Sequence, residues 1–359
     1  MKAKISTAIL SIFAAWLFSA ASSAQNLPDV KLKVIGPQSR GVAWHLIVKP
    51  FWDEELPKLS NGAIQPDLAS ITELGLSGSE VFRLLKMGVA DLGIIVMGYA
   101  SGEVPELDGF DLAGAVPNVE ALGAVTTAYG PVVNDIMLKR VGLRVLGYFP
   151  LGQQGLWCST PISGIGDLKG KKVRVFATTQ ADFVVALGGS PVTMPATEVP
   201  ASLQRKVIDC AVTGLLSGNI GKWPEVTSHL YPINFGWAMM TVVINQKSWD
   251  RLGKNVQDFL TDKIQNVMIA RAWDLARESD DQGIWCSTGD SRCSWGSKES
   301  VTRYNIKLVP YTDSDDAIRK RALEEAALPE FAKRCGAECT SAWNTAAGKA
   351  LGVQAKAKK

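Results

Sequence analysis

Two histidines and an absence of common catalytic motifs limit the chemistry open to this 359-residue chain. The sequence has no GxSxG nucleophile elbow, no P-loop, no HExxH zinc motif and no GxGxxG fingerprint. Only His45 and His229 could supply an imidazole base, so general acid–base and cysteine–histidine catalysis have few candidates. We therefore expect a binding protein that uses no cofactor or metal, and not an enzyme.

The chain also lacks a strong charge excess, since its formal net charge is +3. Nucleic-acid binding requires clustered Lys and Arg in a strongly basic domain, and no such cluster is present. Beyond the N-terminus no apolar run reaches the roughly 20 residues that span a bilayer. Hydrophobic residues make up 47%, which is enough for sizeable cores. We expect a monomer that neither binds nucleic acid nor spans a membrane.

The N-terminus has the pattern of a secretory signal peptide. Lys2 and Lys4 precede an apolar stretch from residue 5 to 20, and small residues, Ser22 and Ala24, precede a cleavage point before Gln25. We therefore predict that residues 1–24 are removed and that the mature protein is exported to the periplasm.

Six cysteines in an exported chain favour disulfides over metal binding. One expected pair, Cys286 and Cys293, flanks a short polar loop, and a second pair, Cys335 and Cys339, is four residues apart. The remaining two, Cys158 and Cys210, form a third candidate pair. No zinc-ligand spacing is present, and neither histidine is near a cysteine pair.

Strands and helices alternate along the chain, which is typical of α/β folds. Predicted strands cover residues 31–35, 63–68, 91–97, 145–149, 155–159, 172–176, 191–194, 207–212 and 239–244. Predicted helices cover residues 44–59, 80–87, 180–187, 198–206, 248–279 and 315–327. The C-terminal tail is expected to pack only in part.

One helix–strand pattern occurs twice, at an offset of 118 residues. The first copy has Glu80, Val81, Leu85, Val89 and Asp91, and the second has Glu198, Val199, Leu203, Val207 and Asp209. Two equivalent α/β lobes facing each other would explain the recurrence, although chance similarity is an alternative. Because ligands of open α/β sheets bind at the carboxyl ends of strands, two such lobes would enclose a cleft.

Arg174 is an unusual residue in the predicted strand 172–176, because its neighbours are Val173 and Val175. A cation on a short apolar strand indicates either a ligand for an anion or a buried structural ion pair. A guanidinium group forms a charged, two-pronged donor that fits a carboxylate. The structural alternative is an ion pair with an acid such as Asp209.

Several segments resemble the DctP-type substrate-binding proteins of TRAP (tripartite ATP-independent periplasmic) transporters. The resemblance covers nearly the whole mature chain and rests on DLKGKKVRV, GGSPVTMPATEVPASLQRKVIDCA, TELG, EVFRLLKMGVADLGII, SGEVPELDGFDL and VINQKSWDRL. It implies a two-lobed α/β clamshell of the type II-like periplasmic-binding-protein class, with hinge strands and a long bracing helix. Lobe I would comprise residues 25–150 and about 242–285, lobe II residues 151–241 and about 286–345, and residues 346–359 a flexible tail.

The resemblance also implies a role and a site. The protein would bind a small organic acid anion and deliver it to the small and large TRAP membrane subunits. Arg174 matches the arginine that binds the ligand carboxylate in this family. Other cleft positions implied by the resemblance are Gln38, Trp44, Glu73, Tyr99, Trp157, Thr213 and Trp237. For the tryptophans, ordinary packing is an equal alternative.

Four positions depart from the family pattern. Trp157 stands where a second arginine is common, and Thr213 stands where an asparagine faces the ligand. Lys206 replaces a glycine and Pro200 replaces a tyrosine. Loss of a second cation would favour a less polar acid, such as an aromatic or branched monocarboxylate. The family also places the strands of Cys158 and Cys210 near each other. Alternative functions are a binding protein of another transporter or sensor, or a periplasmic enzyme.

Overall fold

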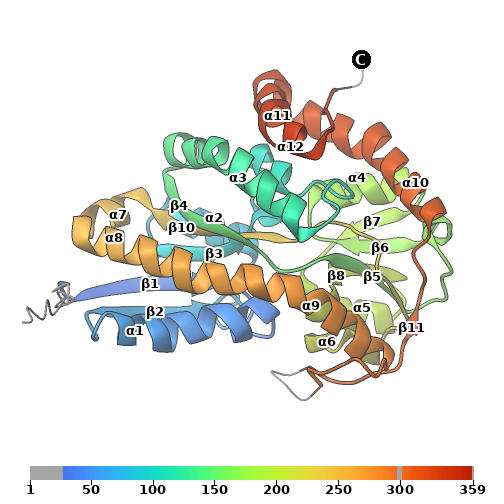
Figure 1. The fold of residues 1–359 in the computed structure, drawn as a ribbon, viewed down its shortest axis with the longest axis horizontal. Coiled ribbons are helices and arrows are strands. Elements are labelled where there is room, and N and C mark those ends of the chain that lie inside the picture. Colours follow the sequence, from blue (N-terminus) through green and yellow to red (C-terminus); the bar gives the residue numbers. More distant parts are fainter. Residues whose placement is uncertain (1–26, 297–300, 358–359) are drawn as a thin grey trace, which may run out of the picture.

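Two β-sheets with helices on both faces form the framework of the computed structural model, which describes residues 27–296 and 301–357 (Figure 1). The first sheet, in the order β2-β1-β3-β10-β4, contains β1 (Val30–Gly36), β2 (Ile64–Ser70), β3 (Leu92–Val96), β4 (Leu143–Pro150) and β10 (Met239–Asn245). The second sheet, in the order β11-β9-β5-β8-β6-β7, contains β5 (Gln154–Cys158), β6 (Lys172–Val175), β7 (Ser190–Thr193), β8 (Cys210–Gly214), β9 (His229–Tyr231) and β11 (Lys307–Leu308). We call the parts built on these sheets lobe I and lobe II.

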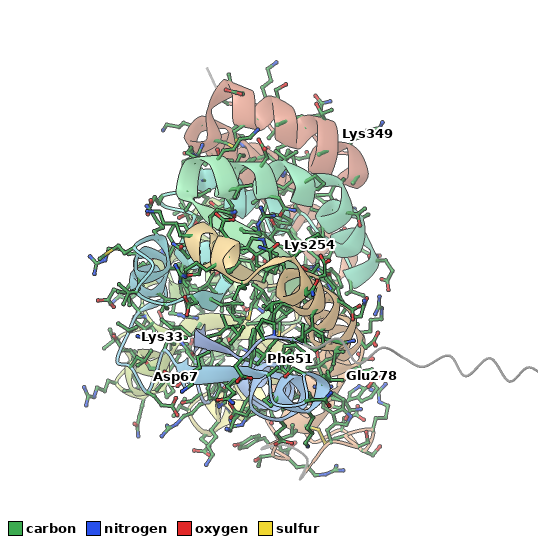
Figure 2. All side chains as sticks on the ribbon, turned by 90° about the vertical axis from the view of Figure 1, so that its left-hand side faces the viewer. Lys33, Phe51, Asp67, Lys254, Glu278 and Lys349 are labelled. Carbon is green, nitrogen blue, oxygen red and sulfur yellow. A yellow bond between two sulfur atoms is a disulfide. The ribbon has the colours of Figure 1, made fainter. Side chains whose placement is uncertain are left out.

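The helices cover these sheets. They are α1 (Leu56–Leu59), α2 (Gly78–Lys86), α3 (Val119–Ile136), α4 (Thr178–Ala186), α5 (Val199–Gln204), α6 (Leu215–Ile220), α7 (Gln246–Arg251), α8 (Lys254–Lys263), α9 (Ala270–Thr288), α10 (Asp313–Ala322), α11 (Leu328–Trp343) and α12 (Lys349–Leu351). Phe51, on the helical stretch before α1, is fully buried against the lobe I sheet, whereas charged side chains such as Lys254 and Lys349 lie on the outside (Figure 2). Within the described residues, none of the helices combines the length and apolarity needed to cross a bilayer.

The two lobes repeat one arrangement, as the recurring sequence pattern predicts. In lobe I the carboxylate of Asp91 accepts a hydrogen bond from the backbone N–H of Lys33 at 2.9 Å. In lobe II the carboxylate of Asp209 accepts one from the backbone N–H of Lys172 at 2.8 Å. Each aspartate precedes a strand that runs parallel to the strand of its lysine. The matching bonds place β1 and β3 in one lobe in the same relation as β6 and β8 in the other.

The chain crosses between the lobes at residues 151–153 and again at residues 232–238. A partly buried carboxylate holds each crossing: Asp280 accepts the N–H of Gln153 at 3.0 Å, and Asp111 accepts the N–H of Trp237 at 2.7 Å. Gly152 has φ +107°, and a Cβ there would lie 2.7 Å from the Asp280 carboxylate, so the first crossing requires glycine. These contacts fix how the two sheets are connected.

A continuous helical segment from α8 through Ile264–Ile269 to α9 spans both lobes (Figure 1). In lobe I, Val256, Leu260 and Met268 are buried against the sheet. In lobe II, α9 packs so closely on α6 that a Cβ at Gly283 would lie 2.4 Å from the backbone of Leu215. The long bracing helix is therefore confirmed, and it extends to Thr288 rather than ending near residue 279.

The C-terminal segment differs from the prediction. Residues 346–359 were expected to form a flexible tail and residues 286–345 to belong to lobe II. The first part of that range does belong to lobe II, because β11 joins its sheet and Val309 and Ala322 are buried in its core. From α11 onward the segment returns to lobe I, where Phe331, Trp343, Ala347 and Ala355 are buried in the core, over α3. Apolar residues at helical spacing along α11 and the turns that follow give this segment a continuous face that packs on the first lobe.

All six cysteines form disulfides, which confirms the three expected pairs. They join Cys158 to Cys210, Cys286 to Cys293, and Cys335 to Cys339. The first bridge links neighbouring positions of the antiparallel strands β5 and β8. No cysteine is left as a free nucleophile or metal ligand.

Candidate functional site

A cavity of about 340 Å³ lies between the lobes, within the range of small-molecule sites. Lobe I contributes the loop after β1, the end of β3 and Tyr99; lobe II contributes Gln154, Arg174 and residues that follow β6 and β8. A second cavity of about 750 Å³ adjoins it and shares Gln38, Tyr99 and Phe176. The parallel strands β1, β3, β6 and β8 all end at this cleft, as expected for open α/β sheets.

Arg174 is the most constrained polar side chain of the cavity. Its residue is 1% exposed, and its Nε and Nη1 donate to the carbonyl oxygens of Met194 at 3.0 Å and Val212 at 2.7 Å. A guanidinium group has five N–H bonds, and these two carbonyls accept from only two of them. Neither carbonyl accepts from Nη2. The side chain is thus held in place by the backbone while part of its donor set faces the cavity.

Burial lowers the pKa of Arg174 from 12.5 to about 10, and the neighbouring Tyr99 opposes that change. The group remains cationic near neutral pH. Across residues 27–296 and 301–357, no carboxylate forms an ion pair with it. The expected alternative partner, Asp209, is instead occupied by the backbone of Lys172. A buried, unpaired cation is costly, and a bound anion would relieve that cost.

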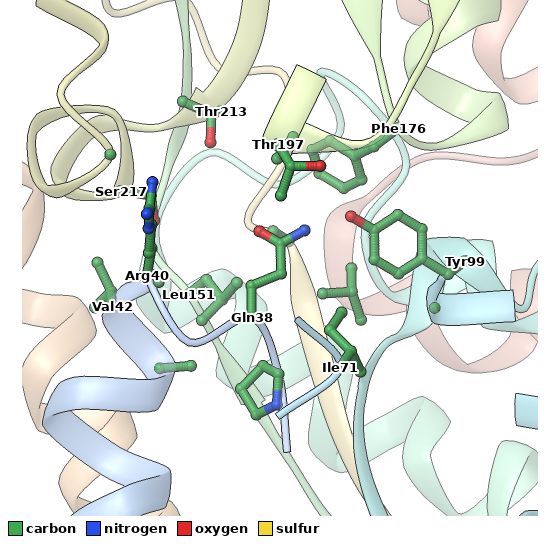
Figure 3. Close-up of a pocket in the computed structure, with 18 of the residues that line it drawn as sticks. Gln38, Arg40, Val42, Ile71, Tyr99, Leu151, Phe176, Thr197, Thr213 and Ser217 are labelled. Atoms are coloured by element: carbon green, nitrogen blue, oxygen red, sulfur yellow. The ribbon is translucent and has the colours of Figure 1, made fainter. Parts of the chain in front are cut away.

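Aromatic rings continue from Arg174 across the cleft. The guanidinium carbon of Arg174 lies 5.2 Å from the centre of the Phe176 ring, within cation–π range. Phe176 in turn meets the ring of Tyr99 from lobe I, edge to face, with centroids 6.2 Å apart (Figure 3). This cluster brings the anchor on one lobe into contact with the other lobe.

The lobes meet at backbone level beside this cluster. A Cβ placed on Gly98 would lie 3.0 Å from the Cβ of Ala177, which follows Phe176. Gly98 precedes Tyr99 at the end of β3. We call this contact between Gly98 and Ala177 the rim contact.

The structure brings four of the predicted site residues together on the cavity wall. Arg174 lines it from lobe II. Thr213 lines it from the same lobe, and Gln38 and Tyr99 line it from lobe I (Figure 3).

Trp157 does not reach the cavity. It lies in the same row of the sheet as Arg174, because Arg174 pairs with Ala211 and Ala211 pairs with Trp157. Its side chain is fully buried and meets the ring of Trp223 edge to face at 6.5 Å. Trp223 lines the cavity, so Trp157 forms the layer beneath it. It packs in the core, which is the alternative that the sequence left open.

Three other candidates also lie away from the cavity wall. Trp44 packs in the lobe I core against Gly36. The indole N–H of Trp237 donates to the carbonyl of Val116 at 3.0 Å, and the ring is buried. Glu73 is exposed and accepts from the backbone and hydroxyl of Ser70, bonds that lower the pKa of Glu73.

Several lining residues were not predicted from the sequence. They include Arg40, Leu151, Phe176, Thr197, Ser217 and Trp223. Phe176 directly follows β6, and Ser217 lies in the helix that follows β8, so the rule that ligands bind at carboxyl ends of strands could have located both. Arg40 lies in an irregular loop, where periodicity carries no signal.

Comparisons with known proteins agree with this architecture. Residues 39–284 match the family model described as bacterial extracellular solute-binding protein, family 7. The chain is 25% identical over 266 residues to the sialic acid-binding periplasmic protein SiaP of Vibrio cholerae, covering 74% of this chain and 80% of that protein.

Solved structures show the same fold. A TRAP periplasmic solute-binding protein from Desulfovibrio salexigens with bound orotic acid superposes with a TM-score of 0.77 at 16% identity, covering 90% of this chain and 98% of that one. A sugar acid-binding protein from Advenella mimigardefordensis in complex with galactonate gives a TM-score of 0.77 at 19% identity, with coverage of 90% and 99%. At these identities the likeness establishes the two-lobed fold.

Proposed function

Because this chain belongs to family 7 of the bacterial extracellular solute-binding proteins, we propose that it is the periplasmic receptor of a TRAP transporter and that it binds a small organic acid anion in the interlobe cleft. One observation carries the proposal: Arg174 is buried, fixed by two carbonyls and without an ion-pair partner among the described residues. The similar proteins named above bind sialic acid, orotic acid and galactonate, which are all carboxylates at neutral pH.

In this proposal the ligand carboxylate binds the edge of the Arg174 guanidinium that the two carbonyls leave open, beside Tyr99. Thr213 from lobe II and Gln38 and Tyr99 from lobe I supply further hydrogen-bonding groups around it. Closure of the lobes removes water from the carboxylate–guanidinium pair and so strengthens it. The loaded receptor then delivers the anion to the transporter's membrane subunits, and the receptor itself performs no chemistry.

The test is a thermal-shift screen of the purified protein against organic acids, followed by calorimetry. A bound acid raises the melting temperature by mass action. Loss of a charged, desolvated partner costs roughly 2–5 kcal/mol, so Arg174→Met should weaken binding about 30-fold or more. Arg174→Lys keeps the charge but loses the two-pronged geometry, and should give an intermediate loss.

Arg205 provides a matched control, because it is exposed on the same lobe and lies outside the cavity lining. Arg205→Gln should leave the affinity unchanged. The proposal is wrong if no organic acid raises the melting temperature, or if Arg174→Met binds the identified acid as tightly as the unaltered protein does. Turnover of a bound acid would instead indicate an enzyme.

A further inference from the structure

The cavity between the lobes contains two positive charges and no negative one. Its lining includes Arg40 and Arg174, and no Asp, Glu, Lys or His occurs among the described residues that form its wall. Its other polar side chains are neutral amides and hydroxyls, including Gln38, Gln154 and Thr213. This cavity therefore offers two cationic contacts to a ligand and no carboxylate. Glu80 lines only the adjoining cavity, and its carboxylate is bonded to the N–H and hydroxyl of Ser77.

The two arginines belong to opposite lobes. Arg174 is on β6 of lobe II, whereas Arg40 is in the loop between β1 and the first helical turn of lobe I. Figure 3 shows the Arg40 side chain extending across the cleft toward the side where Thr213 and Ser217 lie. In the described part of the chain Arg40 forms no ion pair, and its side chain is exposed. A ligand seated on Arg174 thus meets a second, uncommitted cation from the facing lobe.

The wall around these groups is largely apolar. Ile71, Ile95, Leu151 and Trp223 line the cavity from both lobes. Such a wall suits a carbon skeleton with few hydroxyl groups, because burying unpaired hydroxyls would cost free energy. The charged contacts are therefore concentrated on the two arginines.

We propose that Arg40 is the residue that recognises the second end of the ligand, and that it selects organic anions with two acidic groups, no ammonium group and an apolar body. The inference rests on the proposed function, in which Arg174 binds the first acidic group. An amino acid would place its ammonium group in a cavity that holds two arginines and no carboxylate, which disfavours it by repulsion and by loss of hydration.

This assignment differs from the expectation based on Trp157. Trp157 on β5 stands where a second arginine is common in the family, and its presence favoured a monocarboxylate ligand. In the structure Trp157 lies beneath Trp223, outside the cavity lining. The second cation comes instead from lobe I. A ligand with two acidic groups would therefore bridge Arg174 on one lobe and Arg40 on the other, so that the second group is bound only when the lobes close.

The experiment measures affinities by calorimetry for a matched panel. It contains succinate, glutarate, adipate and phthalate, each with the analogues in which one carboxylate is replaced by a methyl or an aminomethyl group. The proteins are the unaltered chain, Arg40→Gln and Arg83→Gln. Arg83 is exposed on lobe I and lies outside the lining of the cavity, so it controls for the change in net charge.

We expect a diacid to bind most tightly, and Arg40→Gln to weaken that diacid about tenfold, the effect of losing one charge-assisted hydrogen bond. The matched monoacid should change less than about twofold with the same substitution, and Arg83→Gln should alter neither. Because the comparison is between two ligands on one protein, a general loss of folding cannot imitate the result.

Three outcomes would overturn the inference while leaving the Arg174 anchor in place. These are a monoacid or an amino-bearing analogue that binds as tightly as the diacid, equal weakening of both by Arg40→Gln, and no weakening of the diacid. If no member of the panel binds but the thermal-shift screen finds an acid with one acidic group or with an ammonium group, this inference fails and the proposed function stands. If no organic acid binds at all, both fail.

Discussion

The carboxylate of Asp280 should make folding stability depend on pH in a direction opposite to that of most aspartates. Asp280 lies on α9 and accepts the backbone N–H of Gln153 with both oxygens, at 3.0 Å each. Burial, aided by the nearby negative charge of Asp281, raises the pKa of Asp280 from 3.8 to about 7. The hydrogen bond from Gln153 opposes that rise but does not cancel it.

The sign follows from linkage. The folded protein holds the proton on Asp280 more tightly than the unfolded chain does, so this contribution to stability is present below pH 4 and is lost as the pH rises through about 7. A shift of about three pKa units corresponds to at most about 4 kcal/mol. The side chain is partly accessible, and screening by solvent reduces the expected change to about 2–3 kcal/mol.

Asp280→Asn removes the charge while keeping a carbonyl oxygen that can accept the Gln153 N–H. Urea titrations followed by tryptophan fluorescence at pH 4.5, 6 and 8 would give the free energy of unfolding of each protein. We expect the stability of the unaltered protein relative to Asp280→Asn to fall by about 2–3 kcal/mol across this range. Glu278→Gln, which alters an exposed carboxylate on the same helix, is the control. Parallel pH curves for the unaltered protein and Asp280→Asn would refute the reasoning.

Two further predictions concern packing and cross-links. Replacing both Cys158 and Cys210 with alanine should lower the free energy of unfolding by about 4 kcal/mol, because the bridge closes a loop of 52 residues. Replacing both Cys286 and Cys293, which are seven residues apart, should lower it by about 2.5 kcal/mol. Chemical denaturation of both variants measures the difference, and equal losses would contradict the loop-length argument. Gly283→Ala should lower the melting temperature by several degrees, because its Cβ would lie 2.4 Å from the backbone of α6; an unchanged melting temperature would show that α6 moves away freely.

Much of the fold could be predicted because apolar runs and turn residues mark buried strands directly. Val81 and Leu85 of the recurring pattern are buried in lobe I, and their counterparts Val199 and Leu203 are buried at the equivalent place in lobe II. Local patterns of this kind depend on residues close in sequence. The placement of the C-terminal helices depends on which distant surface accepts their apolar face, and the sequence alone does not specify it.

The site was predicted only in part, for a geometric reason. Alternation along a strand indicates which residues share a face but not how far along the strand a cavity begins. Trp157 and Arg174 occupy one row of the sheet, yet only the long arginine side chain reaches the cavity, while Trp223 covers the indole. Arg40 lies in a loop whose path depends on packing of the whole lobe, so no sequence pattern located it.

The rim contact between Gly98 and Ala177 lies apart from the residues that line the cavity. How the lobes approach each other there and what the cavity accepts are therefore set by different residues. A Cβ on Gly98 would lie 3.0 Å from the Cβ of Ala177, so there is little room for a larger side chain at either position, beside the Tyr99–Phe176 pair that also joins the lobes. Residues on the cavity wall, such as Thr213 and Leu151, lie elsewhere and can change without altering that contact. Substitutions inside the cleft can therefore change the shape and polarity of the cavity without altering this approach of the two lobes.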